Sequence, residues 1–234
     1  MGKKWVPLES NPEVMNEYCA KLGLNPSKHA FHDVFGLDEE LLAMVPKPVH
    51  AVILCYPITP ETEAAAKQED EQQAAQPQPK SELYYSKQTV SNACGTMAIL
   101  HAVGNNMDEC KPAEGSFLDQ FFKATQSLNP EERAKFIEDP PSDGPNIESA
   151  HQSAAASGQS AAPSENEEVM LHFVTFIHKD GHLWQLDGRR RAPVCHGPTT
   201  QDKLLESSAQ IVKQFAEKSQ SISFNVVALG PAAE

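Results

Sequence analysis

Residues 170–186 constrain the fold more than any other part of the chain. Two β-rich runs flank Asp180-Gly181, a dipeptide typical of two-residue hairpin turns. A turn of that length fixes the register of the two strands and places His172 and Asp187 on one face as diagonal neighbours, roughly 7–8 Å apart along the backbone. An imidazole and a carboxylate can bridge that separation. The register alone therefore predicts a contact between His172 and Asp187.

Capping signals and apolar periodicity predict the helices. Ser10-Asn11-Pro12-Glu13 is typical of a helix start, and apolar side chains then recur at helical spacing until Gly23. The run over residues 94–103 is apolar on nearly all sides, which predicts a helix buried in the middle of the domain. Further helices are expected after Ser116, after Asn129 and over residues 200–218.

Apolar runs predict the remaining strands. Residues 49–56 lie between two prolines and have the length and apolarity of a buried central strand. Residues 223–229 form a last apolar strand. Together with the hairpin, these segments predict an α/β fold of the α+β kind, with a mainly antiparallel central sheet flanked by helices.

Two segments have the composition of loops. Residues 59–80 are rich in Glu, Gln, Ala and Pro and lack large apolar side chains, so we expect an exposed and mobile loop. Residues 139–168, rich in Pro, Ser, Ala and Gly, are too long for an ordinary connection within a compact domain. Since 40% of the 234 residues are apolar, which suffices for an ordinary core, we expect residues 1–234 to form a single domain.

The charge balance argues against several classes of partner. The 19 Lys and Arg residues against 32 Asp and Glu residues give a formal net charge of −13, which repels nucleic acid and anionic lipid and favours a basic partner. No apolar stretch reaches the roughly 20 residues that span a bilayer, and no signal peptide is evident. We therefore expect a monomer of the cytoplasm, or also of the nucleus, without membrane contact.

The cysteines and histidines indicate free thiols rather than metal ligands. The five cysteines are odd in number, widely spaced and without a C-x-x-C pair, which favours reduced thiols over a disulfide framework or a zinc site. Among the nine histidines, no pair lies four residues apart on a predicted helix. We therefore expect no metal and no cofactor.

Four residues together suggest a cysteine hydrolase. Cys94 would begin the buried helix, where the helix dipole favours a thiolate nucleophile. His172 would serve as the base and Asp187 would orient its ring. The Cys94 backbone N–H and the Gln88 side-chain amide would donate hydrogen bonds to an oxyanion. Each of the four alone has an ordinary structural interpretation, so the prediction depends on the complete set.

Three sequence blocks hold these four residues. Residues 88–96 read Gln-Thr-Val-Ser-Asn-Ala-Cys-Gly-Thr, residues 171–173 read Leu-His-Phe, and residues 181–189 read Gly-His-Leu-Trp-Gln-Leu-Asp-Gly-Arg. These three blocks resemble, in that order, the nucleophile signature, the His strand and the Asp strand of the ubiquitin C-terminal hydrolases, which are peptidases of the C12 type. Residues 5–14 and 224–229 extend the resemblance over the whole chain, and it is greatest to the short, single-domain L-type isozymes.

This resemblance implies a papain-like cysteine peptidase fold and a thiol hydrolase that cleaves small or unfolded adducts from the C-terminal glycine of ubiquitin. It assigns Cys94 as nucleophile, His172 as base, Asp187 as the partner of His172 and Gln88 as oxyanion donor. It also implies that residues 139–168 cross over the active site. The residues that it places against ubiquitin are Pro7, Leu8, Glu9, Ser10, Asn11, Pro12, Ser221, Ile222, Ser223, Phe224, Asn225 and Val226.

Two alternative functions stay open at this point. In the first, the chain is a protein that holds ubiquitin and stabilises the free monomer, with only slow turnover. Alternatively, it is a hydrolase whose substrate is a ubiquitin-like modifier. A fluorogenic ubiquitin adduct separates the first alternative from the enzyme, and competition between the two modifiers separates the second.

Overall fold

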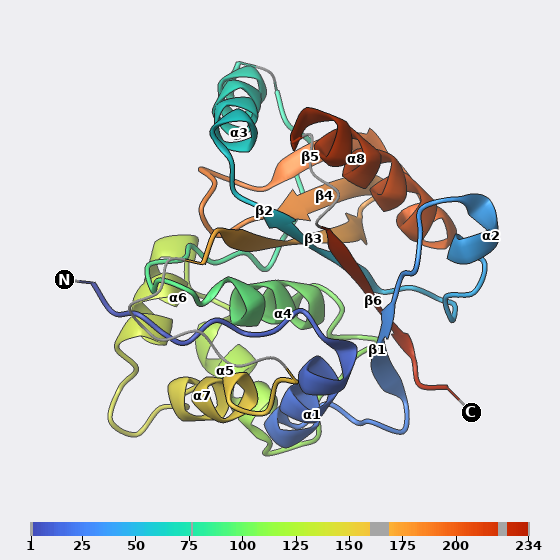
Figure 1. Cartoon of the computed structure of the whole chain (residues 1–234). Coiled ribbons are helices and arrows are strands. Elements are labelled where there is room, and N and C mark those ends of the chain that lie inside the picture. The colour runs from blue at the N-terminus through green and yellow to red at the C-terminus, as the bar shows by residue number, and fades with distance from the viewer. Residues whose placement is uncertain (1, 76, 160–168, 220–223, 234) are drawn as a thin grey trace.

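The computed structural model describes residues 2–75, 77–159, 169–219 and 224–233. Within these residues the strands form one six-stranded sheet in which every neighbouring pair is antiparallel (Figure 1). The expected antiparallel sheet is confirmed. The strands are β1 (His29–Asp33), β2 (Ala51–Pro57), β3 (Leu171–Lys179), β4 (His182–Leu186), β5 (Val194–Pro198) and β6 (Asn225–Pro231), in the spatial order β1-β6-β2-β3-β4-β5.

Helices cover both faces of this sheet. They are α1 (Pro12–Leu22), α2 (Glu39–Leu42), α3 (Pro60–Ala74), α4 (Cys94–Gly104), α5 (Phe117–Thr125), α6 (Pro130–Glu138), α7 (Glu148–Ala155) and α8 (Leu204–Ser219), with a short 3₁₀ turn, η1 (Gln201–Lys203), before α8. Figure 1 shows α8 on one face and α4 on the other, with α1, α5 and α7 beyond α4. None of the described helices is long and apolar enough to cross a membrane.

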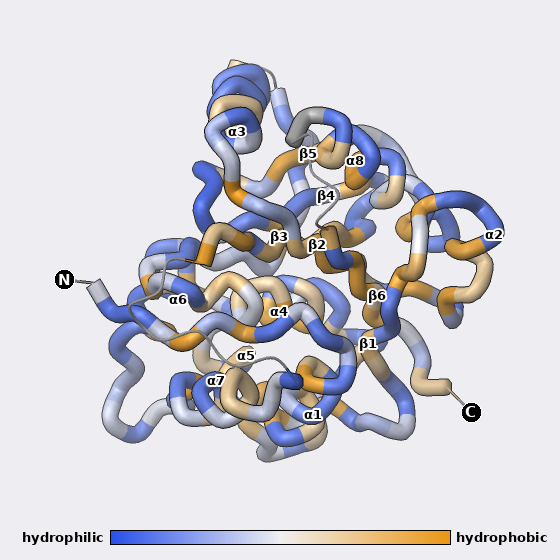
Figure 2. Tube along the Cα trace, in the orientation of Figure 1, coloured by the Kyte–Doolittle hydropathy of each residue, from blue (hydrophilic) through white to orange (hydrophobic). Residues whose placement is uncertain are grey.

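Strand β2 explains why both faces are covered. Its first six residues are all buried, as the apolar run over residues 49–56 predicts. Alternate side chains point to opposite faces, so Ile53 packs in the core layer that contains α4, whereas Leu54 packs in the layer that contains α8. Figure 2 shows the hydrophobic colour concentrated along β2 and β6, while α3 is mainly hydrophilic.

The β3–β4 hairpin has the predicted register. Lys179 pairs with His182 at the turn, and the pairing continues to Thr175 and Leu186. Asp180 and Gly181 have positive φ values of 50° and 77°, which is the conformation of a type I′ turn. The two-residue turn is therefore confirmed.

The predicted helix starts are also confirmed. Asn11 caps α1 by accepting a hydrogen bond from the backbone N–H of Glu13, and Gly23 ends the helix with a left-handed φ of 108°. Ser116 and Asn129 cap α5 and α6 in the same way.

The prediction of a mobile loop over residues 59–80 is wrong, because residues 60–74 form α3. Thr59 and Thr62 form a reciprocal capping box, and Pro60 occupies the first turn, where its missing N–H costs nothing. The Ala, Glu and Gln residues that follow are strong helix formers. Because α3 buries only Thr62, the segment lacks the apolar pattern that would have indicated a helix.

The long segment 139–168 is not without structure either. It contains α7, and residues 160–168 lie outside the described residues. The buried His151 anchors α7, since its Nδ1 lies 2.7 Å from the Thr96 hydroxyl on α4 and its Nε2 lies 2.6 Å from the carbonyl oxygen of Val6. The buried His151 ring of α7 therefore links this helix to α4 and to the N-terminal segment through hydrogen bonds.

Candidate active site

Cys94 is the first residue of α4. The preceding residue, Ala93, provides no side-chain cap, so the backbone N–H groups of the first turn have no side-chain partner there. Asn92 turns the chain into the helix with a left-handed φ of 62°, and its side-chain amide donates to the carbonyl oxygen of Trp5 at 3.0 Å. The Cys94 side chain is thus held at the positive end of a helix dipole, as predicted.

His172 and Asp187 form the predicted contact. The ring Nε2 lies 2.7 Å from Asp187 Oδ1, and the two side chains are 3% and 5% exposed. Cys94 and His172 line the same pocket, and Cys94 is among the groups that raise the pKa of the ring. Since Nε2 is engaged with Asp187, Nδ1 is the ring nitrogen left to act on a thiol. The structure therefore confirms the contact between the imidazole and the carboxylate, and places Cys94 on the wall of the pocket that His172 also lines.

The electrostatics favour a charged His172–Asp187 pair. Burial alone would lower the pKa of His172, but the charge and hydrogen bond of Asp187, with a smaller contribution from Cys94, outweigh burial and raise that pKa. Burial alone would raise the pKa of Asp187, but His172 and the Arg189 backbone N–H outweigh it and lower that pKa. Each partner thus stabilises the ionised form of the other.

Two neighbours fix the position of Asp187. The Arg189 backbone N–H donates to Asp187 Oδ1 at 2.9 Å. The Tyr85 hydroxyl lies 2.8 Å from the carbonyl oxygens of both Asp187 and Arg190, so it holds the turn after β4 closed. The carboxylate that contacts His172 is therefore preorganised by its own loop.

Helix α3 braces this loop from outside. The Arg190 side chain, 5% exposed, donates to Asp70 at 2.8 Å and to Glu69 at 3.0 Å on α3. Arg189 pairs with Glu63 of the same helix at 3.0 Å, although both of these side chains are more exposed. The segment expected to be a loop thus supplies the anions that hold the loop carrying Asp187.

Gln88 lies beside this group. Its backbone N–H donates to the carbonyl oxygen of Gly188 at 2.9 Å, and a Cβ on Gly188 would come within 2.9 Å of the Gln88 Cβ, so the close approach requires glycine. The side-chain amide donates to the Val90 carbonyl oxygen at 3.1 Å. The Gln88 amide is thus near Cys94 but engaged with the backbone.

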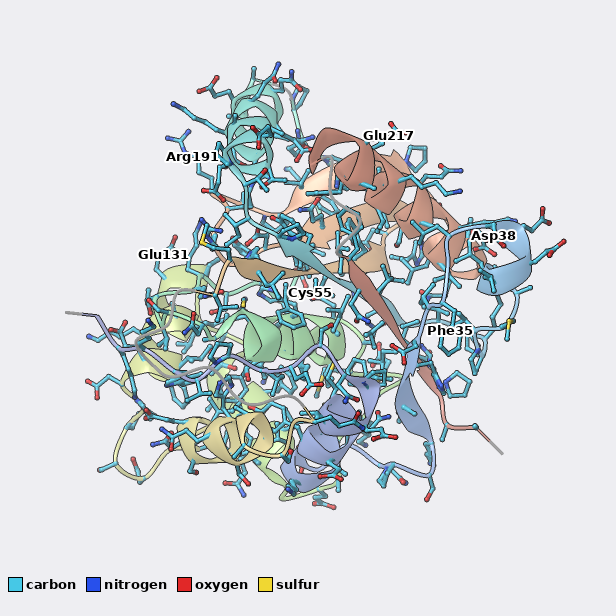
Figure 3. The ribbon with its side chains drawn as sticks, viewed as in Figure 1. Phe35, Asp38, Cys55, Glu131, Arg191 and Glu217 are labelled. Atoms are coloured by element: carbon cyan, nitrogen blue, oxygen red, sulfur yellow. The ribbon has the colours of Figure 1, made fainter. Side chains whose placement is uncertain are left out.

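Two pockets meet at Cys94. The first, with a volume of about 180 Å³, is apolar and runs between the N-terminal segment, the end of α7 and the start of β3. Cys55 of β2 lines this pocket, and Figure 3 shows it between β2 and α4. The second pocket is lined by residues 88–92 with His172 and Arg189. An extended chain that passed from one pocket to the other would cross the sulfur.

The two segments expected to contact ubiquitin lie next to each other. Residues 7–10 line the first pocket, and the Ser10 hydroxyl donates to Asn225 Oδ1 of β6 at 2.6 Å. Asn11 and Pro12 stand at the start of α1 and are partly exposed, whereas Val226 is buried in the core. Ser221, Ile222 and Ser223 lie outside the described residues.

Several residues of this site gave no recognisable local signal. Tyr85, Arg190 and His151 act through contacts with distant segments, so spacing along the chain does not reveal them. Asn92 had a usable signal, because Asn adopts the left-handed conformation more readily than most non-glycine residues. All five cysteines are free thiols, as predicted.

Comparison with known proteins agrees with this geometry. The model of the family described as ubiquitin carboxyl-terminal hydrolase, family 1, matches residues 5–217. Ubiquitin carboxyl-terminal hydrolase 3 of Arabidopsis thaliana is 43% identical over 97% of this chain and 94% of its own length. The isozyme L1 of Rattus norvegicus is 40% identical over 97% of this chain and 98% of its own length.

A solved structure shares the fold. The catalytic domain of Trichinella spiralis UCH37, bound to ubiquitin vinyl methyl ester, superimposes with a TM-score of 0.74 at 22% identity and covers 97% of this chain and 95% of its own. The matched family, the relatives and the shared fold all point the same way. This chain belongs to the ubiquitin carboxyl-terminal hydrolase family 1, a family of cysteine peptidases.

Proposed function

We propose that this chain is a deubiquitinating thiol hydrolase that cleaves small or unfolded adducts from the C-terminal glycine of ubiquitin. The observation that carries the proposal is the buried His172–Asp187 contact beside a pocket that Cys94 and His172 both line. The names of the relatives support ubiquitin as the substrate, and the similar UCH37 structure holds a ubiquitin derivative.

In the first half of the reaction, the Cys94 thiolate attacks the carbonyl carbon of the terminal glycine and forms a tetrahedral intermediate. The Cys94 backbone N–H and the Gln88 amide donate hydrogen bonds to the oxyanion. The His172 imidazolium then gives its Nδ1 proton to the leaving amine as the carbon–nitrogen bond breaks. The product at this stage is a thioester between Cys94 and ubiquitin.

In the second half, His172 accepts a proton from water, and the resulting hydroxide attacks the thioester carbonyl. The carbon–sulfur bond breaks, which releases the C-terminal carboxylic acid of ubiquitin and regenerates the Cys94 thiolate beside a protonated His172, and the acid then loses its proton to solvent. Asp187 stays ionised throughout and holds the ring orientation.

The Gln88→Ala variant is expected to lower kcat by about 10²–10³-fold with little change in KM, since the oxyanion would lose a donor that the bound substrate does not need. The Gln88→Glu variant is the matched control, because it keeps the length of the side chain but replaces the donor with an acceptor. Steady-state hydrolysis of a fluorogenic ubiquitin amide measures both variants. A wild-type kcat in either variant contradicts the role given to Gln88.

The walls of the first pocket limit the size of the adduct. Ala155, the last residue of α7, and Val169, which lies shortly before β3, both line that pocket. We propose that the segment 139–168 restricts bulky leaving groups, as the family resemblance implies; residues 160–168 of this segment lie outside the described residues. The comparison to make is between folded diubiquitin and a small ubiquitin amide, and equal kcat/KM values for the two would contradict the restriction.

The function is tested by the release of fluorophore from a ubiquitin C-terminal amide. Turnover that is lost on covalent capture by a ubiquitin-based active-site probe supports the proposal. Tight binding of ubiquitin without turnover would favour a ubiquitin-holding protein instead. A ubiquitin-like modifier that competes better than ubiquitin would change the substrate.

The net charge of −13 complements a basic partner and is expected to speed its encounter with this chain. We propose that a monomer carries this activity, because all parts of the site come from one chain. Association rates that do not fall with added salt would argue against electrostatic steering. An activity per active site that changed with the protein concentration would argue against the monomer.

A further inference from the structure

Three side chains with metal-binding atoms meet outside the active site. His29 begins β1, His50 directly precedes β2, and Cys110 lies in the loop that follows α4. Their ligand atoms all lie within 4.8 Å of one another. His29 Nδ1 is 3.9 Å from Cys110 Sγ, and the two imidazole rings are 5.9 Å apart at an interplanar angle of 67°.

This cluster is well separated from the catalytic sulfur. Helix α4 has 11 residues and is therefore about 16 Å long, with Cys94 at its first residue and the Cys110 loop beyond its last. None of the three residues lines a pocket that contains Cys94. The proposed hydrolysis makes no use of them.

The backbone holds the cluster in place. The Asn106 side chain donates to the His50 carbonyl oxygen at 3.0 Å, and the Cys110 backbone N–H donates to the Asn106 carbonyl oxygen at 2.7 Å. The His50 backbone N–H donates to the Leu229 carbonyl oxygen of β6 at 2.7 Å. Cys110 is fully buried and His50 is 6% exposed. Two of the three side chains thus have little freedom to move.

The local charges suit a cation. The imidazoles of His29 and His50 each offer one ring nitrogen to the cluster, and Cys110 offers its sulfur. The Glu109 carboxylate acts on both rings with negative charge, while Lys28 opposes it at His29. An imidazole binds a metal in its neutral form, and a cysteine binds it as the thiolate.

We propose that His29, His50 and Cys110 bind one divalent cation of the zinc class through two imidazole nitrogens and one thiolate. Zinc prefers this nitrogen and sulfur donor set, at distances of about 2.0–2.1 Å to nitrogen and about 2.3 Å to sulfur. The three donor atoms lie within 4.8 Å of one another, and binding requires them to close around the ion to these distances. The sulfur–metal bond replaces the sulfur–hydrogen bond of Cys110, and the proton passes to solvent.

The fourth tetrahedral position is left for a solvent molecule. A cation held in this way would link the end of the catalytic helix region to β1 and to the entry into β2. The expectation of no metal rested on spacing along the chain, and these three residues come from separate segments that only the fold brings together.

The test titrates Co²⁺ into the full chain carrying Cys94→Ser, so that the active-site thiol does not compete. We expect one equivalent of Co²⁺ to produce a thiolate-to-cobalt charge-transfer band. Cys110→Ala should abolish the band, and His29→Gln should weaken zinc binding, measured by competition with a chromophoric chelator, at least about tenfold. The matched controls are Cys195→Ala and His32→Gln, which replace the same residue types outside the cluster.

Circular dichroism establishes that each variant is folded. Because His29 is partly exposed, His29→Gln should disturb the fold less than a change at Cys110 or His50. A rise in Tm with added zinc in the Cys94→Ser protein, lost in His29→Gln but kept in His32→Gln, supports the site. Absence of the charge-transfer band, or a band that survives Cys110→Ala, overturns it. None of these readouts depends on hydrolysis, so they are independent of the proposed function.

Discussion

Replacing Cys94 with alanine is expected to reduce kcat for a ubiquitin amide by at least about 10⁴-fold, because Cys94 is the proposed nucleophile that forms the acyl intermediate. Ubiquitin binding should persist, since Cys94 is 8% exposed at the meeting point of two pockets and contributes little area to a large protein interface. Burst kinetics with a fluorogenic substrate measure the first effect, and calorimetry with free ubiquitin measures the second.

Two further cysteine variants make this experiment decisive. Cys195→Ala removes a half-exposed thiol of β5, outside both pockets, and should leave kcat unchanged. Cys55→Ala removes the second thiol of the first pocket, where burial raises the pKa to about 12 and so disfavours a thiolate. Activity retained in Cys94→Ala but lost in Cys55→Ala would move the nucleophile to β2.

Replacing Asp187 with asparagine is expected to lower kcat by about 10³–10⁴-fold, with a smaller effect on KM. The amide keeps the shape of the carboxylate but loses the charge that stabilises the imidazolium of His172 and fixes the proton on Nε2. Asp202→Asn, an exposed carboxylate of η1, is the matched control. A kcat close to that of the parent would contradict the orienting role.

The same variant has a signature that does not depend on turnover. In the parent, Asp187 raises the pKa of His172 against the effect of burial, so in Asp187→Asn the pKa should fall. In the parent, these two pKa shifts also make the free energy of unfolding depend on pH. The contribution of the raised His172 pKa is lost as pH rises through that pKa, and the contribution of the lowered Asp187 pKa is lost as pH falls through that pKa. NMR titration of the ring protons measures the change.

The sequence predicted the hairpin contact because every step of that inference is local. A two-residue turn sets the register, and the period of two along a strand then decides which side chains share a face. The helix caps at Asn11, Ser116 and Asn129 are local in the same sense. Residues that are close together in the sequence are therefore enough to predict these elements.

The elements that were missed depend on tertiary contacts. Strand β5 contains Gly197 and Pro198, which argue against a strand, and it forms only because β4 offers an edge. Strand β1 buries Phe31 alone, so it has no apolar alternation to detect. Helix α3 is held by a cap and by ion pairs to Arg190 rather than by an apolar face. Composition could not reveal these contacts.

The hairpin has one further consequence for motion at the site. The imidazole and the acid belong to a single continuous segment, so they move as one rigid body, whereas the sulfur is carried by a helix on a separate part of the chain. Any loosening of the site must therefore occur along the seam between α4 and β3. A spectroscopic distance measured between a label on α4 and a label on β3 would report this motion. A distance between two labels within the hairpin would not change.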